Sequence, residues 1–462
     1  MPISNILNTG RHAMGAHRAA MELSGQNATN AATVGYSRRR GTLSSLGLGA
    51  GRMTASGVNL EQPRRVVDLL SNRTVRQARE EVSFHQGRRA TLETIEAVVA
   101  PEGAGLAAAL DGFFDAFGQL SSRPDGDVER AEVVHRGQVL SESFRQTRAE
   151  LDAMRGPVEQ TLRDGLQRVN ALSERVARIN GDLAVAEVGD VEAAELRDER
   201  DKALDELSGL IGARVIEHGD GAVSVSLASG ASLVSGARSS KLQLQVVDDR
   251  LDLRLAGPGG PPVALRAQDA RGEVGGLIKA HDEDIRGAIE ALDALAFGLA
   301  GAVDELHRQG VGLDGATGRA FFEGVDEQEG AAGRIDVSAA ITADPGAIAA
   351  TRQAGRLPGG SELSIELAEV RERAIGGLAG RSVEEALTAL QISAGQAVDQ
   401  TFDGLESAEA RAQTFESLRE STRGVSLDEE MADLVKFQQG FEAASRLVRV
   451  ADELMQTVLG MI

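Results

Sequence analysis

The segment SLGLGAGRM contains the first residues whose types and spacing could bind a ligand. Gly47, Gly49 and Gly51 would let the backbone curve closely around a phosphate group, as glycine-rich phosphate loops do. Such loops are normally followed by Lys and Ser or Thr, and they lie within a βαβ unit. Neither feature is present in this sequence. We therefore interpret the three glycines as turn residues.

The run His281-Asp282-Glu283-Asp284 has the residue types that bind metal ions. Consecutive residues on a helix point in different directions, so these four side chains cannot converge on one ion. Acidic residues do stabilise the positive end of a helix dipole. We therefore expect the run to form the acidic N-terminus of a helix, and we predict no metal site.

A third group of carboxylates, Asp428, Glu429, Glu430 and Asp433, could supply the acid and base of a glycoside hydrolase. No aromatic platform for a sugar accompanies them. Ser426 followed three residues later by Glu429 has the spacing of a capping box, which satisfies free N–H groups at a helix start. We therefore expect these acids to begin a C-terminal helix.

Catalysis by other side chains finds no support in the sequence. There is no cysteine, which excludes disulfides, thiolate zinc sites and thiol nucleophiles. The seven histidines are scattered, and no Gly-x-Ser-x-Gly nucleophile elbow is present. The single tyrosine, Tyr36, lies in a loop and could be either buried or a contact residue. We predict a protein that is not an enzyme and that has no cofactor.

Composition indicates a helical protein of several domains. A chain of 462 residues is too long for one core and predicts two to four domains. No signal peptide or run of about 18 apolar residues is visible. The net charge is −21, but residues 1–79 hold eleven arginines and only three acidic residues. That basic segment lacks stacking aromatics, so nucleic-acid binding is not favoured.

Both ends of the chain have the apolar spacing of amphipathic helices. The N-terminal seam is weakly apolar, and the segment from Asn27 to Gly35 has the side chains that end a helix. It consists of Ile3, Leu7, Gly10, Met14, His17, Met21, Ser24 and Ala28. The C-terminal seam is much stronger, and it consists of Leu434, Phe437, Phe441, Ala444, Val448, Ala451, Met455, Val458 and Ile462.

Between the ends, the pattern predicts four helices and one small β region. The helices span 106–120, 151–183, 195–210 and 282–307, and Pro157 is expected to kink the second near its start. Residues 214–266 alternate apolar and polar side chains with turns at Gly219–Gly221 and Asp248–Asp249, which indicates hairpins. Residues 311–375 show no clear period. The predicted fold is mainly α with a small β domain.

Several segments resemble the hook-associated protein 1 family of flagellar axial proteins. The N-terminal segment GQNATNAATVGYSRRR and the C-terminal segment SLDEEMADLVKFQQGFEAASRLVRVADELMQTVLGMI carry the resemblance most specifically. Internal segments, including FFDAFGQLSSRPDGDVERAEVV and ELRDERDKALDELSGLIGARV, follow in the same order. The resemblance covers most of the chain. One departure is that Gln26-Asn27-Ala28-Thr29-Asn30 replaces the usual Asn-Asn-Ile-Ala-Asn, and little room is left for an outer domain in 311–375.

The resemblance implies a structural subunit, secreted by type III export, which polymerises as a ring at the hook tip. It implies the hook protein, the next hook-associated junction protein and an export chaperone on the C-terminal helix as partners. The expected parts are a terminal coiled-coil domain (1–60 and 400–462), a helical bundle (61–213 and 272–310), a β domain (214–271) and a mixed segment (311–399). The expected polymerisation residues are Leu7, Met14, Met21, Asn27, Asn30, Tyr36, Leu434, Phe437, Phe441, Val448, Met455, Val458 and Ile462.

Three alternatives stay open on the sequence alone. Within the same class, the chain could be a hook or distal-rod protein. From other classes we retain a peptidoglycan hydrolase and a nucleic-acid-binding protein, which zymography and a salt-dependent DNA-binding assay would reveal. Burial of the C-terminal seam alone does not offset the entropy of ordering that helix. Folding of the two ends is therefore expected to depend on assembly.

Overall fold

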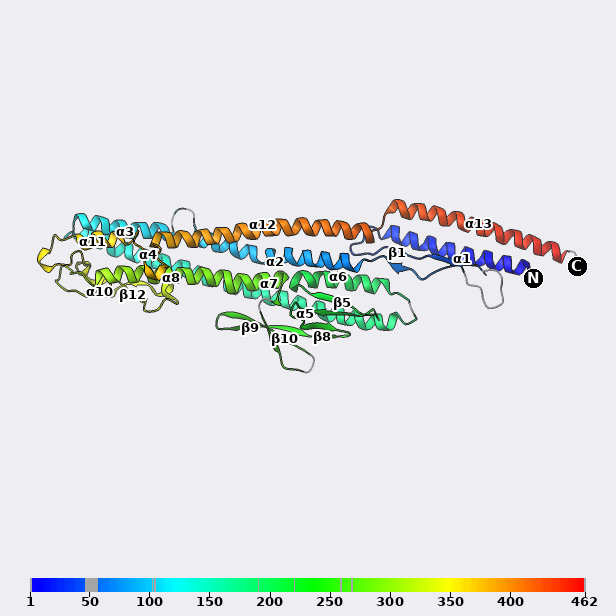
Figure 1. The fold of residues 1–462 in the computed structure, drawn as a ribbon, viewed down its shortest axis with the longest axis horizontal. Helices are drawn as coiled ribbons and strands as arrows, with labels where there is room; N and C mark the ends of the chain where they lie inside the picture. The colour runs from blue at the N-terminus through cyan, green and yellow to red at the C-terminus, as the bar shows by residue number, and fades with distance from the viewer. Residues whose placement is uncertain are drawn as a thin grey trace.

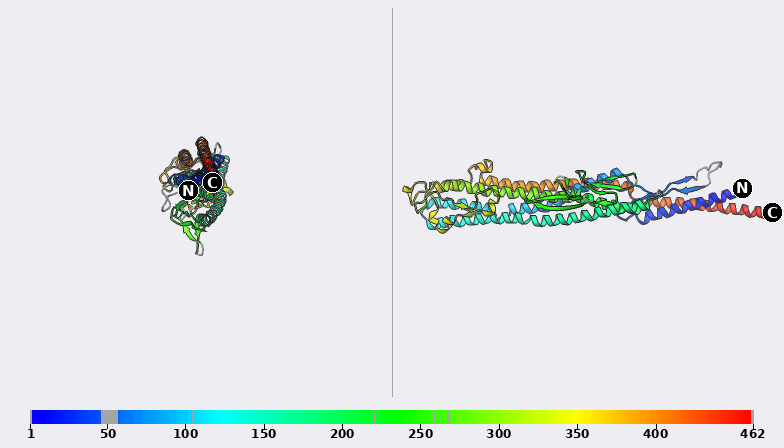
Figure 2. Two further views of the ribbon diagram at one scale, coloured as in Figure 1. Left: turned by 90° about the vertical axis from the view of Figure 1, so that its right-hand side faces the viewer. Right: turned by 90° about the horizontal axis from the view of Figure 1, so that it is seen from below.

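The protein is a long helical rod whose two termini lie together at one end (Figure 1). Viewed along its axis the rod is narrow, and from the side the terminal helices extend beyond the main bundle (Figure 2). The computed structural model describes residues 2–45, 57–101, 103, 105–189, 191–219, 221–257, 260–266 and 269–460. Gly47, Gly49 and Gly51 lie outside these described residues. The predicted fold class, mainly α with small β sheets, is confirmed.

The terminal helices α1 (Pro2–Thr29) and α13 (Leu427–Leu459) pack side by side along most of their length (Figure 1). Helix α1 ends where the sequence predicts, because the segment that follows contains side chains that compete with helical hydrogen bonds. Its buried residues are small or polar, which allows a close approach of the two backbones; they are Gly10, Ala16, Ala20, Ser24 and Asn27. We call this pair the terminal hairpin.

The main bundle consists of long helices whose apolar faces meet in one core. Helix α12 packs along α2, α2 also contacts α6 and α7, and α3 packs on α4. The bundle helices are α2 (Leu69–Val99), α3 (Leu106–Ser122), α4 (Asp127–Ala153), α5 (Arg155–Ala186), α6 (Ala194–Ile211), α7 (Gly272–Lys279), α8 (Arg286–His307) and α12 (Val383–Arg423).

Two of the predicted helices correspond to α3 and α6, and the long seam at 151–183 corresponds to α5. The helical run is interrupted at Met154, so α4 ends at Ala153 and α5 begins at Arg155. Pro157 therefore lies in the first turn of α5, where a missing backbone N–H costs little. The expected kink is a short break three residues before the proline.

The prediction that a helix begins at Asp282 is wrong, because the helix starts ten residues earlier at Gly272. His281 and Asp282 lie inside it, within the π-helical turn η2 (Ala280–Ile285) that joins α7 to α8. The segment GEVGGLIKA is poor in helix formers, so the sequence did not indicate that the helix begins there. Its glycines are needed for packing, since a β-carbon on Gly276 would overlap the carbonyl oxygen of Phe84 on α2.

The predicted β region forms two antiparallel sheets that lie against α5. Asn180 on α5 donates to the carbonyls of Val223 and Gly236, and Asn170 pairs with the backbone of Leu242. The first sheet has the order β5 (Arg214–Glu217), β6 (Val223–Ser226), β7 (Ser232–Ser235) and β8 (Arg238–Ser239). The second has the order β11 (Val263–Leu265), β10 (Arg250–Ala256) and β9 (Lys241–Val247).

The predicted hairpin turn at Asp248–Asp249 joins β9 to β10, and both residues have positive φ, as a type I′ turn requires. At the other predicted turn, Gly219 and Gly221 lie between β5 and β6, while residue 220 is outside the described residues. Three short strand pairs complete the β structure: β1 (Arg39–Arg40) with β4 (Arg64–Arg65), β2 (Leu43–Ser45) with β3 (Val58–Leu60), and β12 (Phe322–Glu323) with β13 (Asp336–Val337).

The segment that showed no period, residues 311–375, wraps around the end of the bundle farthest from the termini (Figure 1). In the core, the ring of Phe321 packs at a tilt against Phe113 and Phe117 of α3, and the ring of Phe322 packs against Phe113. Its helical turns, besides β12 and β13, are α9 (Ala331–Arg334), α10 (Ala339–Ala343), η3 (Pro345–Ala347), η4 (Ala354–Arg356) and α11 (Glu362–Glu369), followed by η5 (Gly376–Leu378).

Four buried polar side chains of the bundle hold this segment through its backbone. Asp304 accepts from the N–H groups of residues 321 and 322, and Asp293 accepts from those of residues 330 and 332. Arg130 donates to the carbonyls of residues 124, 345, 346 and 348. His307 donates from Nδ1 to one carbonyl and accepts at Nε2 from the N–H of residue 349. These side-chain contacts satisfy backbone groups that helices and strands would otherwise pair, and such contacts leave no periodic pattern in the sequence.

Candidate assembly site: the paired terminal helices

The inner face of the terminal hairpin is formed by the predicted seam residues. The Cγ2 methyl of Val448 lies against Gly10, and the ring of His17 covers Gly440 with its centroid 6.3 Å from that of Phe437. Burial lowers the pKa of His17, because the contact removes its imidazole from water. The half-buried members of the seam are Leu7, Met14, Met21, Leu434, Phe437, Phe441, Val448 and Met455.

Val458 is exposed near the end of α13, and Ile462 lies outside the described residues. The other apolar seam residues face the partner helix of the same chain, so within one subunit they join α1 to α13. Their role in polymerisation stays a prediction.

Helix α13 also exposes large apolar side chains beside this seam. They are between 42% and 67% exposed, and we call this set of side chains the outer face of α13: Leu427, Met431, Val435, Leu447, Val450, Leu454, Val458 and Leu459. Leu447 lies at the border with the inner face, because its Cδ2 is 3.5 Å from the position that a β-carbon on Gly10 would occupy. The sequence prediction did not include most of them, because it rests on a single seam with three-four spacing. The signal was present in Leu447, Val450, Leu454 and Val458, which are three or four residues apart.

A buried polar network fastens the two helices at the base of the hairpin. Asn27 is its centre: its Nδ2 donates to Glu430 Oε2 (3.3 Å), and its Oδ1 accepts from the Tyr36 hydroxyl (2.9 Å) and from the Arg39 N–H (3.1 Å). Arg38 donates to Glu430 Oε1 (2.8 Å) and to Glu429 Oε2 (2.6 Å). Burial raises the pKa of the Tyr36 hydroxyl. The predicted contact residues Asn27 and Tyr36 therefore bind within the subunit.

Asn30, by contrast, lies outside this network, and its side-chain amide donates to the carbonyl of Gln26 in its own helix end. The predicted capping box at the start of α13 is half correct. Ser426 accepts from the N–H of Glu429 at 3.4 Å, but the Glu429 carboxylate binds Arg38 instead of returning to the cap. A complete capping box, missed in the sequence, begins α12 at Ser382 and Glu385.

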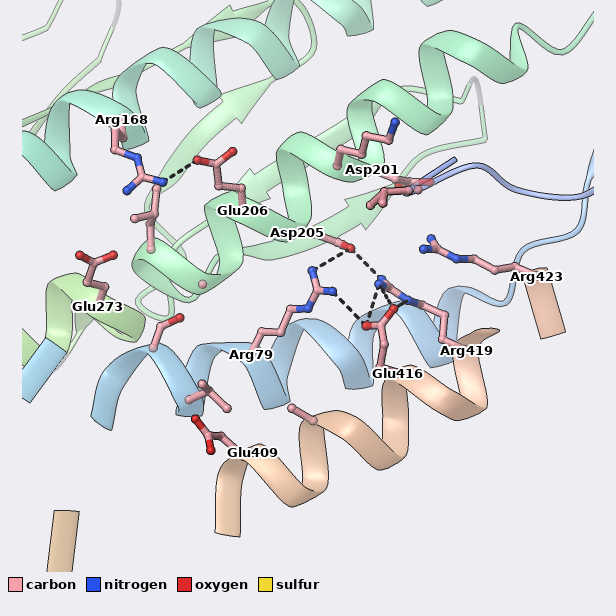
Figure 3. A pocket seen from close by; sticks show the side chains of 18 residues that line it. Arg79, Arg168, Asp201, Asp205, Glu206, Glu273, Glu409, Glu416, Arg419 and Arg423 are labelled. Atoms are coloured by element: carbon pink, nitrogen blue, oxygen red, sulfur yellow. Dashed lines mark hydrogen bonds and ion pairs between the residues drawn. The ribbon is translucent and has the colours of Figure 1, made fainter. Parts of the chain in front are cut away.

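An ionic cluster lies where the hairpin joins the bundle. Asp205 on α6 accepts from Arg76 on α2 and from Arg419 on α12, both at 2.7 Å. Figure 3 shows Arg79 of α2 and Arg419 of α12, each of which pairs with both Asp205 and Glu416, beside a cavity of about 710 Å³. Burial alone would raise the pKa of Asp205, but the attraction of the two arginines lowers it overall. The cluster fixes α2, α6 and α12 relative to one another.

The side chains of the acidic run at 281–284, which have metal-binding residue types, form contacts with other protein groups. His281 Nδ1 lies 2.8 Å from Asp282 Oδ1, Glu283 pairs with Lys279, and Asp284 pairs with Arg88. Asp282 also accepts from the N–H of residue 251 in β10. Among the described residues, no group of three or more His, Cys, Asp or Glu side chains is placed to hold a metal ion.

No helix in the described part of the chain combines the length and the apolar character that crossing a membrane requires. The protein is thus a rod that exposes large apolar side chains of α13 beside its paired termini. Comparison with known sequences and structures identifies the class of assembly.

The profile of the flagellar hook-associated protein FlgK helical domain matches residues 92–322, which is half of the chain. The profile of the flagellar basal body rod FlgEFG protein C-terminal region matches residues 421–461. Flagellar hook-associated protein 1 of Bacillus subtilis is 25% identical, over 98% of this chain and 97% of its own length. The protein of the same name from Salmonella typhimurium is 24% identical, over 69% of this chain and 59% of its own length.

Among solved structures, the flagellar hook junction protein FlgK from Burkholderia pseudomallei shares this fold with a TM-score of 0.51 at 24% identity. The similar part covers 54% of this chain and 46% of that one. The chain therefore belongs to the family of flagellar hook-associated protein FlgK, which confirms the resemblance seen in its sequence. It is a structural, exported component of the bacterial flagellum and not an enzyme.

Proposed function

We propose that this protein forms the junction between hook and filament, by polymerising at the hook tip through its N- and C-terminal helices. The relatives named above are hook-associated, and the solved neighbour is a hook junction protein. The observation that carries the proposal is the outer face of α13. Eight large apolar side chains there are exposed in a single subunit, and their burial against other subunits would supply the driving force for assembly.

The expected neighbours follow from this position in the flagellum. Copies of the chain contact one another in a ring-like layer, the hook protein lies below, and the next hook-associated junction protein lies above. The hairpin presents two helices to these neighbours, α1 with a weakly apolar surface and α13 with a strongly apolar one. Its position at the very end of the rod allows contacts with subunits on several sides (Figure 2).

The same apolar face explains why an export chaperone is expected on α13. An exposed apolar helix invites aggregation before assembly, so a partner that covers the helix in the cell would keep the subunit soluble. We propose that the chaperone releases α13 when the chain enters the type III export apparatus. The face would then be free when the subunit reaches the hook tip.

A hook or rod protein is the second candidate, and one observation favours it. The profile that matches residues 421–461 is named for the rod proteins FlgEFG, so the C-terminal helix does not by itself distinguish the classes. The helical domain at 92–322 matches the hook-associated family instead. This larger match supports the junction.

Clean deletion of the gene in the source bacterium tests the proposal. We expect complete hooks without filaments, together with filament subunits in the culture medium, because filament growth would lack its adaptor. Electron microscopy of hook tips and an immunoblot of the medium provide the measurements. Loss of the hooks themselves would favour a hook or rod protein, and cells with normal filaments would refute the junction.

A further inference from the structure

We propose that neighbouring copies also contact each other through the bundle, with an acidic stripe on α12 of one copy seated in a cationic groove between α2 and β5 of the next. The acidic stripe consists of Asp399, Asp403 and Glu406. The cationic groove is the cavity that contains Arg73 and Arg214. This inference rests on the proposed assembly of the chain with itself, and it assigns a second contact surface beyond the terminal hairpin.

The cationic groove has a volume of about 980 Å³ and is lined by the first turns of α2, the end of α6 and strands β5 and β6. Three large apolar side chains in its wall are mostly exposed: Leu69 (62%), Leu70 (71%) and Ile216 (59%). Strand β5 is also the edge of its sheet, with only β6 as a neighbour in the described chain. Apolar surface beside an open strand edge is a typical docking surface.

Two cations in the groove form no ion pair with any described residue. Its carboxylates are already occupied: Glu80 by Arg271, Asp201 by Arg65 and Arg76, Glu217 by Arg197, and Glu81 by Arg411 on α12. In contrast, Arg73 and Arg214 are exposed, and among the described residues neither lies within ion-pair distance of a carboxylate, although Arg214 is close enough to Glu80 to act on its charge. The groove therefore presents two exposed positive charges beside apolar side chains, which favours an acidic partner.

The acidic stripe has the complementary character. Asp399, Asp403 and Glu406 are spaced by four and three residues, so they lie on one face of α12. All three are exposed, and none forms an ion pair with any described residue. Phe402 lies beside them with half of its surface exposed, and the guanidinium of Arg89 is 5.7 Å from its ring. The stripe thus offers free carboxylates next to one apolar ring.

The two surfaces are formed by different elements of the rod, and among the described residues no ion pair joins them. In Figure 1, α12 follows the upper edge of the bundle, whereas β5 lies toward the lower edge beneath α6. A contact between different surfaces on successive copies is head-to-tail, and repetition of such a contact produces a ring or a helical layer. This is the geometry that a layer of the flagellum requires.

The absence of cysteine from the chain makes a direct cross-linking test possible. Gln77 lines the groove, Gln396 lies one turn before Asp399 on α12, and both are exposed. Flagella would be isolated from cells that express the full chain with Gln77→Cys and Gln396→Cys together, and then oxidised. We expect a ladder of dimers and higher multimers on a non-reducing gel. Each single-cysteine chain should give no ladder, since a head-to-tail contact needs both positions.

Charge-reversal variants provide a second test of the same contact. Arg73→Glu or Asp403→Arg alone should reduce the ladder at least severalfold, and the two changes together should restore it. Glu305→Lys, which reverses an exposed carboxylate on α8 without an ion pair among the described residues, is the matched control and should leave the ladder unchanged. Absence of a ladder in assembled flagella would overturn this inference alone. Failure of the chain to enter flagella at all would instead overturn the proposed function.

Discussion

Val448 on α13 packs directly onto Gly10 on α1, and its Cγ2 methyl lies 2.6 Å from the position that a β-carbon on Gly10 would occupy. Real carbon atoms do not approach so closely, so this contact exists only because residue 10 is glycine. The same is true where the ring of His17 covers Gly440. One glycine on each helix therefore receives a side chain from the other, and the two contacts set the spacing of the terminal hairpin.

The first prediction follows from this contact. Gly10→Ala should raise helix propensity by about 1 kcal/mol, but crowding against the stiff side chain of Val448 should cost about 1–3 kcal/mol. We therefore expect weaker pairing of α1 with α13 and release of subunits from isolated flagella at a lower temperature, measured by sedimentation and immunoblot. Gly15→Ala is the matched control, because outside the nearby backbone of its own helix no described atom lies within 4 Å of its added methyl. Equal dissociation temperatures for the two variants would contradict the close-packing argument.

The second prediction concerns the isolated subunit. The hairpin joins the bundle through polar contacts such as Arg39 with Glu195 and the Ser37 N–H with Asp198, and one face of α13 is uncovered. We expect residues before about 40 and after about 425 to be disordered in a verified monomer, because burial between two helices alone does not offset their conformational entropy. Limited proteolysis with mass spectrometry should trim both ends and leave a resistant bundle. Protection of both ends in the monomer would show that the hairpin is stable by itself.

The fold class and the family could be predicted from the sequence, because the long helices have regular apolar spacing and the terminal segments are specific. The inner seam of the hairpin was also visible. By contrast, the tip at 311–375 was unreadable, since its order depends on single buried groups such as Asp304 and His307 that bind backbone far away in sequence. The boundaries predicted between domains stay predictions, and apolar residues of both sheets, including Val225 and Leu253, join the bundle core.

The candidate site, too, could be predicted from the sequence only in part. Hydrophobic spacing identifies which residues of α13 are apolar, but it cannot tell which of them face α1 and which face other subunits. The start of α7 was missed for a related reason: the glycines that permit close packing on α2 lower helix propensity. Asn27 and Glu430 form their network across more than 400 residues of sequence, and no local pattern indicates such a pairing.

The third prediction uses the buried histidine at the tip. Burial lowers the pKa of His307 to about 4 from an ordinary value near 6.5. The neutral ring is thus favoured in the folded state, so its contribution is full above pH 6.5 and is lost as the pH falls toward 4. The loss should total about 3 kcal/mol in the free energy of unfolding, measured by urea denaturation across this range. His307→Gln should be less stable at pH 7 but should lose less stability on acidification, whereas the exposed control His135→Gln should behave as the parent chain.

The last prediction separates the outer face of α13 from the inner seam. Val450→Asp and Leu454→Asp each place a carboxylate on the outer face, where assembly would bury it among apolar groups. In a single subunit both positions are about half exposed, so neither change should affect the bundle or the contact with α1. Loss of apolar burial together with desolvation of the carboxylate should cost several kcal/mol per contact in the assembled state. We therefore expect subunits with a normal thermal unfolding midpoint that do not cap hooks, as seen by immunoelectron microscopy of hook tips.

The comparison that decides between surfaces uses three further variants. Phe441→Asp and Val448→Asp disrupt the inner seam and should also prevent capping, because the hairpin itself would open. Glu442→Lys changes charge at an exposed polar position of the same helix, so it should cap hooks nearly as well as the parent chain. Secreted amounts must be measured for every variant, since a chaperone on α13 would bind the same apolar side chains. If the two outer-face variants are secreted and incorporated normally while the inner-seam variants fail, α13 serves only to hold α1, and neighbouring subunits must be bound by another surface.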